Sequence, residues 1–208
     1  MVEKEEMILE QLIKRGIHDS RVLQAMREVD RADFVPTPLL EHAYEDRPLP
    51  IGKNQTISQP YIVAYMAQEL RLSPGDRVLE IGTGCGYNAA VLSKLAGEVY
   101  SIEILYWLVI LAQENLKRGS YHNLITKKDD GFSGWPKYAP YNGIVLTAAP
   151  KRIPAPLKQQ LALEGRLIAP VGDGVQDLVV LRKLGEDTFE EKSLLSVNFV
   201  PMTGKAQS

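Results

Sequence analysis

Cysteine, excess basic charge and long apolar runs are all scarce in this sequence of 208 residues. The single cysteine, Cys85, can form neither an internal disulfide nor a cysteine-based zinc cluster, which fits a reducing compartment. A formal net charge of −2 offers no general attraction to nucleic acids or anionic membranes. The longest apolar run, residues 105–112, is far shorter than the ~20 residues that span a bilayer. We therefore expect a cytoplasmic protein that binds no metal, membrane or nucleic acid.

The beginning of the chain also lacks the marks of a secretory signal. Acidic residues in MVEKEEMILEQL stand where a signal peptide needs basic residues and then an uninterrupted apolar stretch. We interpret this segment as mature protein. A hydrophobic fraction of 45% and a charged fraction of 24% are ordinary for a soluble globular protein, and the length suits one domain.

Hydrophobic periodicity predicts helices first and then an alternation of strands and helices. The early helices are expected at 3–15, 20–29 and 61–70. Strands are expected at 77–82, 98–103, 123–129 and 142–148, with helices at 87–96 and 107–118. This alternation indicates an α/β fold with a doubly wound, mostly parallel sheet.

The end of the chain has a different pattern. Residues 165–172, 177–185 and 193–201 have the character of strands with little helix between them, and Gly172-Asp173-Gly174 favours a hairpin. We expect an antiparallel strand pair to close the sheet. The single domain, 1–208, then comprises N-terminal helices with a substrate loop (1–59), a cofactor-binding α/β half (60–150) and C-terminal strands (151–208).

Residues 34–59 form a long stretch of prolines, polar residues and Gly52 without a regular pattern. This stretch is too long for an ordinary connection, so we interpret it as a binding loop or a lid. Its closure over a ligand is a hypothesis that protease sensitivity with and without ligand would test.

The most informative motif is an apolar strand that runs into three alternate glycines and then a helix. Gly82, Gly84 and Gly86 allow bare backbone to approach a ligand closely. A dinucleotide-binding turn needs a small residue where this chain has Tyr87, which disfavours NAD. The S-adenosylmethionine-binding pattern also has an acid two residues before the first glycine, and Glu80 supplies it. The turn therefore predicts S-adenosylmethionine as the cofactor.

Further candidate cofactor residues follow from the same pattern. Thr83 lies inside the turn, and Glu103 ends the next strand about twenty residues on, where an acid accepts hydrogen bonds from ribose hydroxyls. Asp130 and Gly131 follow the third strand, at the position that contacts adenine in such folds. An ordinary turn is a serious alternative explanation of this pair.

Two segments, 43–66 and 78–95, resemble the signature of protein-L-isoaspartate O-methyltransferases. The first contains TISQPY (56–61), which is more specific than the glycine turn. Similar segments, among them IVLTAAP (144–150) and FVPMTG (199–204), extend the resemblance over most of residues 34–204.

The resemblance implies methyl transfer from S-adenosylmethionine to L-isoaspartyl residues of damaged proteins and peptides, with S-adenosylhomocysteine as product. We expect a monomeric repair enzyme. The resemblance also implies that Ser58 is catalytic and that the acceptor pocket is lined by Thr56, Ile57, Val200, Pro201 and Thr203. Spacing alone favours a plainer role, in which Ser58 or Gln59 caps the helix that Pro60 begins.

An isoaspartyl linkage leaves a free α-carboxylate with a pKa of ~3.5, which is ionised at pH 7 and needs no general base. The sequence fits this chemistry, since His18, His42 and His122 lie in unrelated segments and are interpreted as surface or capping residues. Alignment of donor and acceptor is then the main catalytic task. A hydroxyl of Ser58 could orient the carboxylate without a strong ion pair.

Four positions depart from the family pattern, namely Cys85, Asn88, Asp129 and Asn142. We interpret Cys85 as a small residue beside the cofactor because no basic residue adjoins it in the sequence. Residues 103–107 are also unusually apolar, which we interpret as a buried helix face, with a subunit contact as the alternative.

Two other functions remain open. A methyltransferase for nucleobases or small molecules would share the cofactor domain, although Thr147 to Pro150 lacks the polar cluster typical of amino-group methylation. A non-catalytic S-adenosylmethionine-binding protein would leave residues 52–61 without a role.

Overall fold

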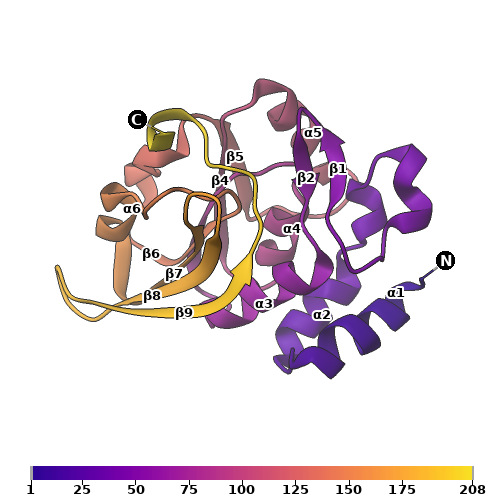
Figure 1. Cartoon of the computed structure of the whole chain (residues 1–208), viewed down its shortest axis with the longest axis horizontal. Helices are drawn as coiled ribbons and strands as arrows, with labels where there is room; N and C mark the ends of the chain where they lie inside the picture. Colours follow the sequence, from indigo (N-terminus) through magenta and orange to yellow (C-terminus); the bar gives the residue numbers. More distant parts are fainter. Residues whose placement is uncertain (1, 208) are drawn as a thin grey trace.

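The fold is built on a seven-stranded sheet with the strand order β5-β4-β3-β6-β7-β8-β9 (Figure 1). The structure is a computed structural model that describes residues 2–207. Neighbours from β5 to β7 are parallel, and the β7–β8 and β8–β9 pairs are antiparallel. The strands are β3 (Arg77–Ile81), β4 (Glu98–Glu103), β5 (Leu124–Lys128), β6 (Tyr141–Leu146), β7 (Leu161–Val171), β8 (Gln176–Lys183) and β9 (Phe189–Val197). This arrangement confirms the predicted α/β fold with a mostly parallel sheet and antiparallel C-terminal strands.

Helices cover both faces of the sheet, because alternate residues of the strands are buried on opposite sides. Val78 and Val99 belong to an apolar cluster that includes the N-terminal helices, whereas the neighbouring Leu79 and Tyr100 belong to a second cluster on the other face. The α-helices are α1 (Lys4–Glu6), α2 (Ser20–Glu28), α3 (Pro60–Leu70), α4 (Tyr87–Ser93), α5 (Tyr106–Leu116) and α6 (Ala155–Gln159). The first cluster therefore joins the N-terminal helices to the sheet through one continuous core.

The N-terminal helices follow the sequence signals closely. A π-helical segment (Met7–Leu12) and a 3₁₀ turn (Ile13–Arg15) continue α1, and Gly16 ends them with a φ of 91°. The side chain of Asp19 accepts hydrogen bonds from two backbone N–H groups of the first turn of α2, as an N-cap does. Further 3₁₀ turns lie at Arg31–Phe34, Thr37–His42, Gly131–Ser133, Pro136–Tyr138 and Gly204–Gln207.

The predicted irregular loop at 34–59 contains a β-hairpin that sequence reasoning missed. Strands β1 (Leu49–Gly52) and β2 (Gln55–Ile57) pair antiparallel, apart from the seven-stranded sheet. Lys53 and Asn54 both have a positive φ, of 53° and 56°, as a two-residue type I′ turn requires. Pro48 and Pro50, just before and within β1, hid the short strands, and Gly52 and Asn54 on either side of Lys53 were the available signal.

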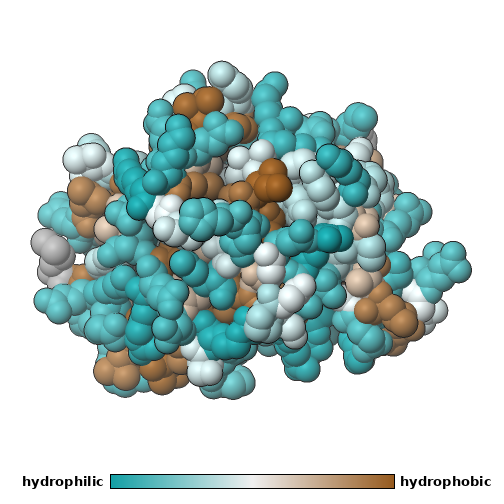
Figure 2. All heavy atoms as spheres, turned by 180° about the vertical axis from the view of Figure 1, so that it is seen from behind, coloured by the Kyte–Doolittle hydropathy of each residue, from teal (hydrophilic) through white to brown (hydrophobic). Residues whose placement is uncertain are grey.

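The start of α5 corrects another expectation. Tyr106 and Trp107 are 65% and 44% exposed, so the interpretation of residues 103–107 as a wholly buried face was wrong. The Trp107 ring lies against Gly52 of the hairpin, where an added Cβ would approach it to 3.1 Å. The surface behind the view of Figure 1 is mainly hydrophilic, with separate rather than continuous apolar groups (Figure 2). Within residues 2–207, every helix is too short or too polar to cross a membrane.

Candidate active site

A cavity of about 670 Å³ lies at the carboxyl ends of the parallel strands. Gly82, Glu103 and Thr147, which end or follow β3, β4 and β6, line it. Since β3 lies between β4 and β6, the strand order reverses here, and such switch points are where α/β sheets bind ligands. Further walls come from β2 of the hairpin, the first turn of α3 and residues 195–203. Figure 1 shows the hairpin and the chain after β9 near the ends of these strands.

Most of the predicted site residues face this cavity. Its lining includes Thr56, Ile57, Ser58, Gly82, Thr83, Gly84, Glu103, Gly131, Val200, Pro201 and Thr203. Three other predicted residues, Glu80, Gly86 and Asp130, lie outside the lining. The structure thus brings together three parts of the sequence, 56–58, 82–131 and 200–203, of which the first and the last are more than a hundred positions apart.

The glycine turn exposes backbone to the cavity and is fixed from behind. Gly82, Gly84 and Gly86 all have a positive φ, of 99°, 57° and 93°. The Thr147 hydroxyl donates a hydrogen bond of 2.6 Å to the Gly82 carbonyl, and an added Cβ at Gly82 would lie 2.3 Å from that hydroxyl oxygen. Gly86 begins α4 as its N-cap residue. Glycine is therefore required at Gly82 for both conformation and space.

Glu103 connects the second strand to the glycine turn. Its two carboxylate oxygens accept hydrogen bonds of 2.9 Å from the backbone N–H groups of Gly84 and Leu105. The residue is only 5% exposed, and what remains exposed lines the cavity. A carboxylate has about four acceptor sites, so each oxygen keeps capacity for a ligand hydroxyl.

Glu80 is completely buried behind the turn instead of facing the cavity. It accepts hydrogen bonds from Asn88, at 2.8 Å, and from the hydroxyl of Ser101, which also lies 2.6 Å from the Thr83 hydroxyl. Burial raises the pKa of Glu80 to about 7, and the two hydrogen bonds oppose this rise. The acid of the motif therefore acts on the shape of the turn through Asn88, Ser101 and Thr83.

Asp130 and Gly131 have different surroundings. Gly131 lines the cavity. Asp130 caps the 3₁₀ turn at Gly131–Ser133 by accepting from the N–H of Phe132, and it also accepts from the N–H of Lys205 at 2.9 Å. The carboxylate of Asp130 therefore ties the C-terminal segment to the end of β5.

Ser58 ends the hairpin segment and faces the cavity. The N-cap of α3 is Gln59, with Pro60 in the first turn, but no side chain caps this helix. Gln59 instead donates to Asp46 at 2.8 Å. Within residues 2–207 the hydroxyl of Ser58 has no hydrogen-bond partner, whereas its carbonyl accepts from Arg31 at 3.0 Å. The hydroxyl is thus left available to the cavity.

Val200, Pro201 and Thr203 form the wall opposite the glycine turn. This segment pairs with the extension of β6, since the N–H of Ala149 donates to the Val200 carbonyl and the N–H of Met202 donates to the Ala149 carbonyl, both at 2.8 Å. Residues that are about fifty positions apart in sequence are thereby held beside each other. Two backbone hydrogen bonds and one isolated bridge therefore fix this wall.

The structure supplies no histidine or cysteine for nucleophilic or acid–base chemistry at this cavity. His18, His42 and His122 are absent from its lining. Cys85 lines it, but burial raises the pKa of its thiol to about 12, so the thiolate form is scarce. No cluster of three or more potential metal ligands occurs in the part of the chain that the structure describes.

Sequence reasoning missed four polar residues at or behind the site. Arg15 and Thr147 line the cavity, while Ser101 and Arg31 are buried behind it. Thr147 could have been found, because it follows a strand at the ligand-binding edge of the sheet. The other three make contacts with residues that are distant in sequence, and no local motif predicts such contacts. Arg15, for example, lies 3.6 Å from the centre of the Tyr61 ring.

The residues that depart from the family pattern also make specific contacts. Asn88 binds Glu80, as described above, and Asn142 accepts a hydrogen bond of 2.9 Å from the backbone N–H of Arg77. Asp129 pairs with Lys127 at 2.7 Å and lies outside the cavity lining.

Comparison with known proteins gives consistent relatives over nearly the whole chain. Residues 3–207 match the profile of a family described as protein-L-isoaspartate(D-aspartate) O-methyltransferase. A protein-L-isoaspartate O-methyltransferase of Gloeobacter violaceus is 50% identical over 199 residues, covering 95% of this chain and 97% of the relative. Protein-L-isoaspartate O-methyltransferase 2 of Pelobacter propionicus is 51% identical over 203 residues, covering 97% of this chain and 90% of the relative.

Solved structures agree with these relatives. A protein-L-isoaspartate O-methyltransferase has a TM-score of 0.89 at 30% identity, covering 98% of this chain and 67% of the other. A structure from Plasmodium falciparum, described as the same kind of enzyme in complex with S-adenosyl-L-homocysteine, has a TM-score of 0.85 at 26% identity, covering 97% and 99%. The chain therefore belongs to the protein-L-isoaspartate(D-aspartate) O-methyltransferase family.

Proposed function

We propose that this chain transfers a methyl group from S-adenosylmethionine to the free α-carboxylate of L-isoaspartyl residues, which initiates repair of damaged proteins and peptides. One observation carries the proposal. Ser58 with its neighbours and Glu103 with the glycine turn line the same cavity, so the residues for the acceptor and for the donor face a common space.

The donor side of the cavity fits an adenosine-containing cofactor. Bare backbone at Gly82 and Gly84 allows close approach, and an added Cβ at Gly84 would meet only a side-chain carbon at 3.7 Å. Glu103 keeps acceptor capacity for ribose hydroxyls. In this proposal Gly82, Thr83, Gly84, Glu103 and Gly131 hold the cofactor, and Glu80, Gly86 and Asp130 support them from behind. S-adenosylmethionine, when bound, supplies a methyl group activated by its sulfonium.

The acceptor side has the composition that an already charged nucleophile needs. Thr56, Ile57, Val200, Pro201 and Thr203 enclose it, and among the described lining residues the only cation is Arg15. The hydroxyl of Ser58 orients the carboxylate by donating one hydrogen bond. A direct ion pair would lower the nucleophilicity of the carboxylate, whereas a hydroxyl aligns it at little cost.

Three accompanying features belong to the same proposal. We take residues 1–208 as one methyltransferase domain, because a single apolar cluster joins the N-terminal helices to the sheet. The low net charge argues against a nucleic-acid partner. A cytoplasmic location fits the single buried cysteine, and a monomeric state completes the proposal.

A labelled methyl donor tests the function directly. The chain is incubated with an isoaspartyl peptide or with its normal aspartyl twin, and label should enter only the isoaspartyl peptide. Label in neither peptide, despite cofactor binding, would overturn the proposal. Label in a nucleoside or small molecule would assign the chain to another class of methyltransferase.

The Ser58→Ala variant tests the role of the hydroxyl. Loss of one hydrogen bond to a charged group, ~1.5–3 kcal/mol, should lower turnover roughly ten- to a hundredfold. Affinity for S-adenosylhomocysteine, measured by calorimetry, should stay unchanged because Ser58 belongs to the acceptor side. Wild-type turnover in this variant would refute the catalytic role.

A further inference from the structure

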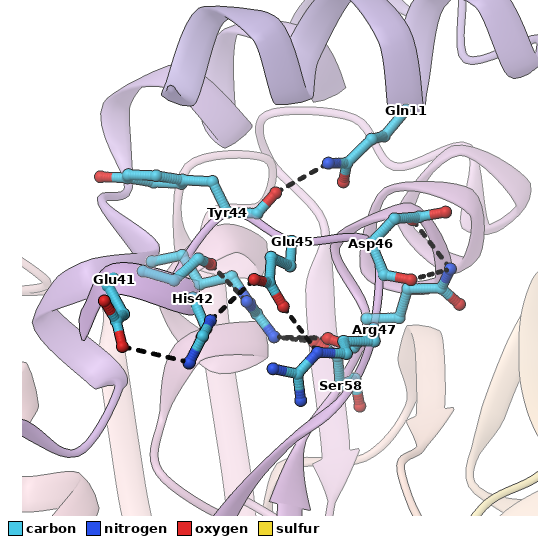
Figure 3. Close-up of polar contacts among 11 residues, drawn as sticks. Gln11, Glu41, His42, Tyr44, Glu45, Asp46, Arg47 and Ser58 are labelled. Carbon is cyan, nitrogen blue, oxygen red and sulfur yellow. Dashed lines mark hydrogen bonds and ion pairs between the residues drawn. The ribbon is translucent and has the colours of Figure 1, made fainter. Parts of the chain in front are cut away.

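Arg31 is a fully buried cation directly behind the hairpin segment that carries Ser58. Its guanidinium donates to three backbone carbonyls, those of Ala43, Arg47 (3.2 Å) and Ser58 (3.0 Å). These carbonyls belong to both ends of the segment 43–58. Figure 3 shows Ser58 close to Arg47 and Asp46 at this point. Arg31 therefore fixes the segment that presents the Ser58 hydroxyl.

The charge of Arg31 has no buried carboxylate partner among the residues that the structure describes. Its Nε is buried without any hydrogen bond, and its only acceptors are neutral carbonyls. Burial lowers the pKa of Arg31, yet a guanidinium stays charged at neutral pH. An uncompensated buried charge is costly, so this position calls for a functional explanation.

The ionisable groups around Arg31 that the structure describes do not neutralise its charge. Asp46 is engaged by Arg15, with 2.6 Å between the carboxylate and the guanidinium, and its side chain is 38% exposed. The side chain of Arg47 pairs with Glu45 at 2.6 Å. On the side of the glycine turn, burial raises the pKa values of the Cys85 thiol and the Tyr87 phenol, so both stay neutral. The field of Arg31 thus reaches the acceptor side of the cavity without a fixed anion between them.

We propose that Arg31 is the electrostatic counterpart of the acceptor carboxylate, acting through the Ser58 peptide and never touching the substrate. The proposal rests on the proposed function, because it takes the group bound at the Ser58 hydroxyl to be an anion. The buried cation offsets the loss of solvation when the carboxylate enters the cavity. Because Ser58 lies between Arg31 and the acceptor carboxylate, the guanidinium forms no ion pair with the carboxylate oxygens, and their lone pairs stay free to attack.

The size of the effect follows from Coulomb's law. A carboxylate at a separation of about 8–10 Å from the guanidinium, taken as the breadth of one intervening residue, would gain roughly fifteen- to thirtyfold in affinity at an effective dielectric constant of about 20. A neutral ligand of the same shape gains nothing from this charge. Arg31 is therefore a positioning residue whose charge discriminates between ionised and neutral acceptors.

The test compares two peptides on the wild type and on Arg31→Gln. One peptide carries the isoaspartyl α-carboxylate and the other the uncharged α-carboxamide, and both are titrated by calorimetry into the S-adenosylhomocysteine complex. In Arg31→Gln the carboxylate peptide should lose roughly fifteen- to thirtyfold more affinity than the carboxamide peptide, whose own loss measures the loosening of the segment alone. Arg31→Lys, which keeps the charge, should restore most of the preference. Equal weakening for both peptides in Arg31→Gln would show a purely structural role and overturn the proposal.

Arg21→Gln is the matched control. Arg21 is half-buried, and its guanidinium, like that of Arg31, donates to two backbone carbonyls, those of Leu72 and Leu95, but it lies outside the surroundings of Ser58. This variant should keep the wild-type preference for the carboxylate. If Arg31→Gln does not fold, the wild type still decides, since equal affinity for the two peptides would refute the charge effect. If the wild type does not methylate isoaspartyl peptides, the proposed function is refuted instead.

Discussion

Replacing Glu80 with glutamine tests how the buried acid behind the glycine turn responds to pH. The pKa of this carboxyl rises from an ordinary value of 4.5 to about 7 because the side chain is removed from water. The folded state therefore holds the proton to higher pH than the unfolded chain does. The stability that Glu80 contributes is fully present below about pH 4.5 and is lost as the pH rises to about 7.

The magnitude comes from the same two values. A rise from 4.5 to about 7, at about 1.4 kcal/mol for each unit, makes ionised Glu80 about 3–4 kcal/mol less favourable to folding than protonated Glu80. Glutamine keeps the shape and hydrogen-bonding capacity toward Asn88 and Ser101 but does not ionise. The variant should therefore gain stability relative to the wild type as the pH rises through this window.

Urea denaturation of both cofactor-free proteins at pH 5, 6, 7 and 8 measures this difference. All other titrating groups are shared, so they cancel when the two free energies of unfolding are subtracted. Ser101→Ala serves as a control, because loss of its hydrogen bond should raise the pKa of Glu80 further and extend the window upward. A difference between wild type and Glu80→Gln that stays constant from pH 5 to 8 would show that the acid does not titrate there.

Two further variants probe the turn itself. Gly82→Ala should lose cofactor binding and at least about 2 kcal/mol of stability, because φ at Gly82 is positive and the new Cβ would clash with Thr147. Adding Thr147→Ala should recover part of this stability. If the double variant recovers none, the clash is not the cause of the loss. Cys85 should resist iodoacetamide at pH 8 until the chain is denatured, as followed by mass spectrometry; rapid labelling of the native chain would contradict its burial and raised pKa.

The sheet and the glycine turn could be predicted because their signals are local. An apolar strand, three glycines and a helix follow one another within about a dozen positions, and the acid of Glu103 comes at the end of the next strand. The hairpin β1–β2 was missed because its strands span only a few residues each. A turn of Lys53 and Asn54 is also a weaker signal than Asn-Gly.

The contacts of the acids could not be read from the chain in the same way. Glu80 matches a cofactor motif, but its burial depends on Ser101 from the adjacent strand and Asn88 from α4. Likewise, nothing near Arg31 in the sequence indicates that it binds the carbonyl of Ser58, 27 positions later. Such relations arise only when distant segments pack, so they follow from tertiary structure and not from periodicity.

The wall formed by Val200, Pro201 and Thr203 has a consequence for biosynthesis. These residues follow every strand of the sheet, yet they line the cavity only where their segment pairs with Ala149. A ribosome delivers the hairpin, the glycine turn and Glu103 long before it delivers this wall. During synthesis the glycine turn and the hairpin can therefore fold while this side of the cavity is still open, and the cavity closes only after residues 200–203 have left the ribosome.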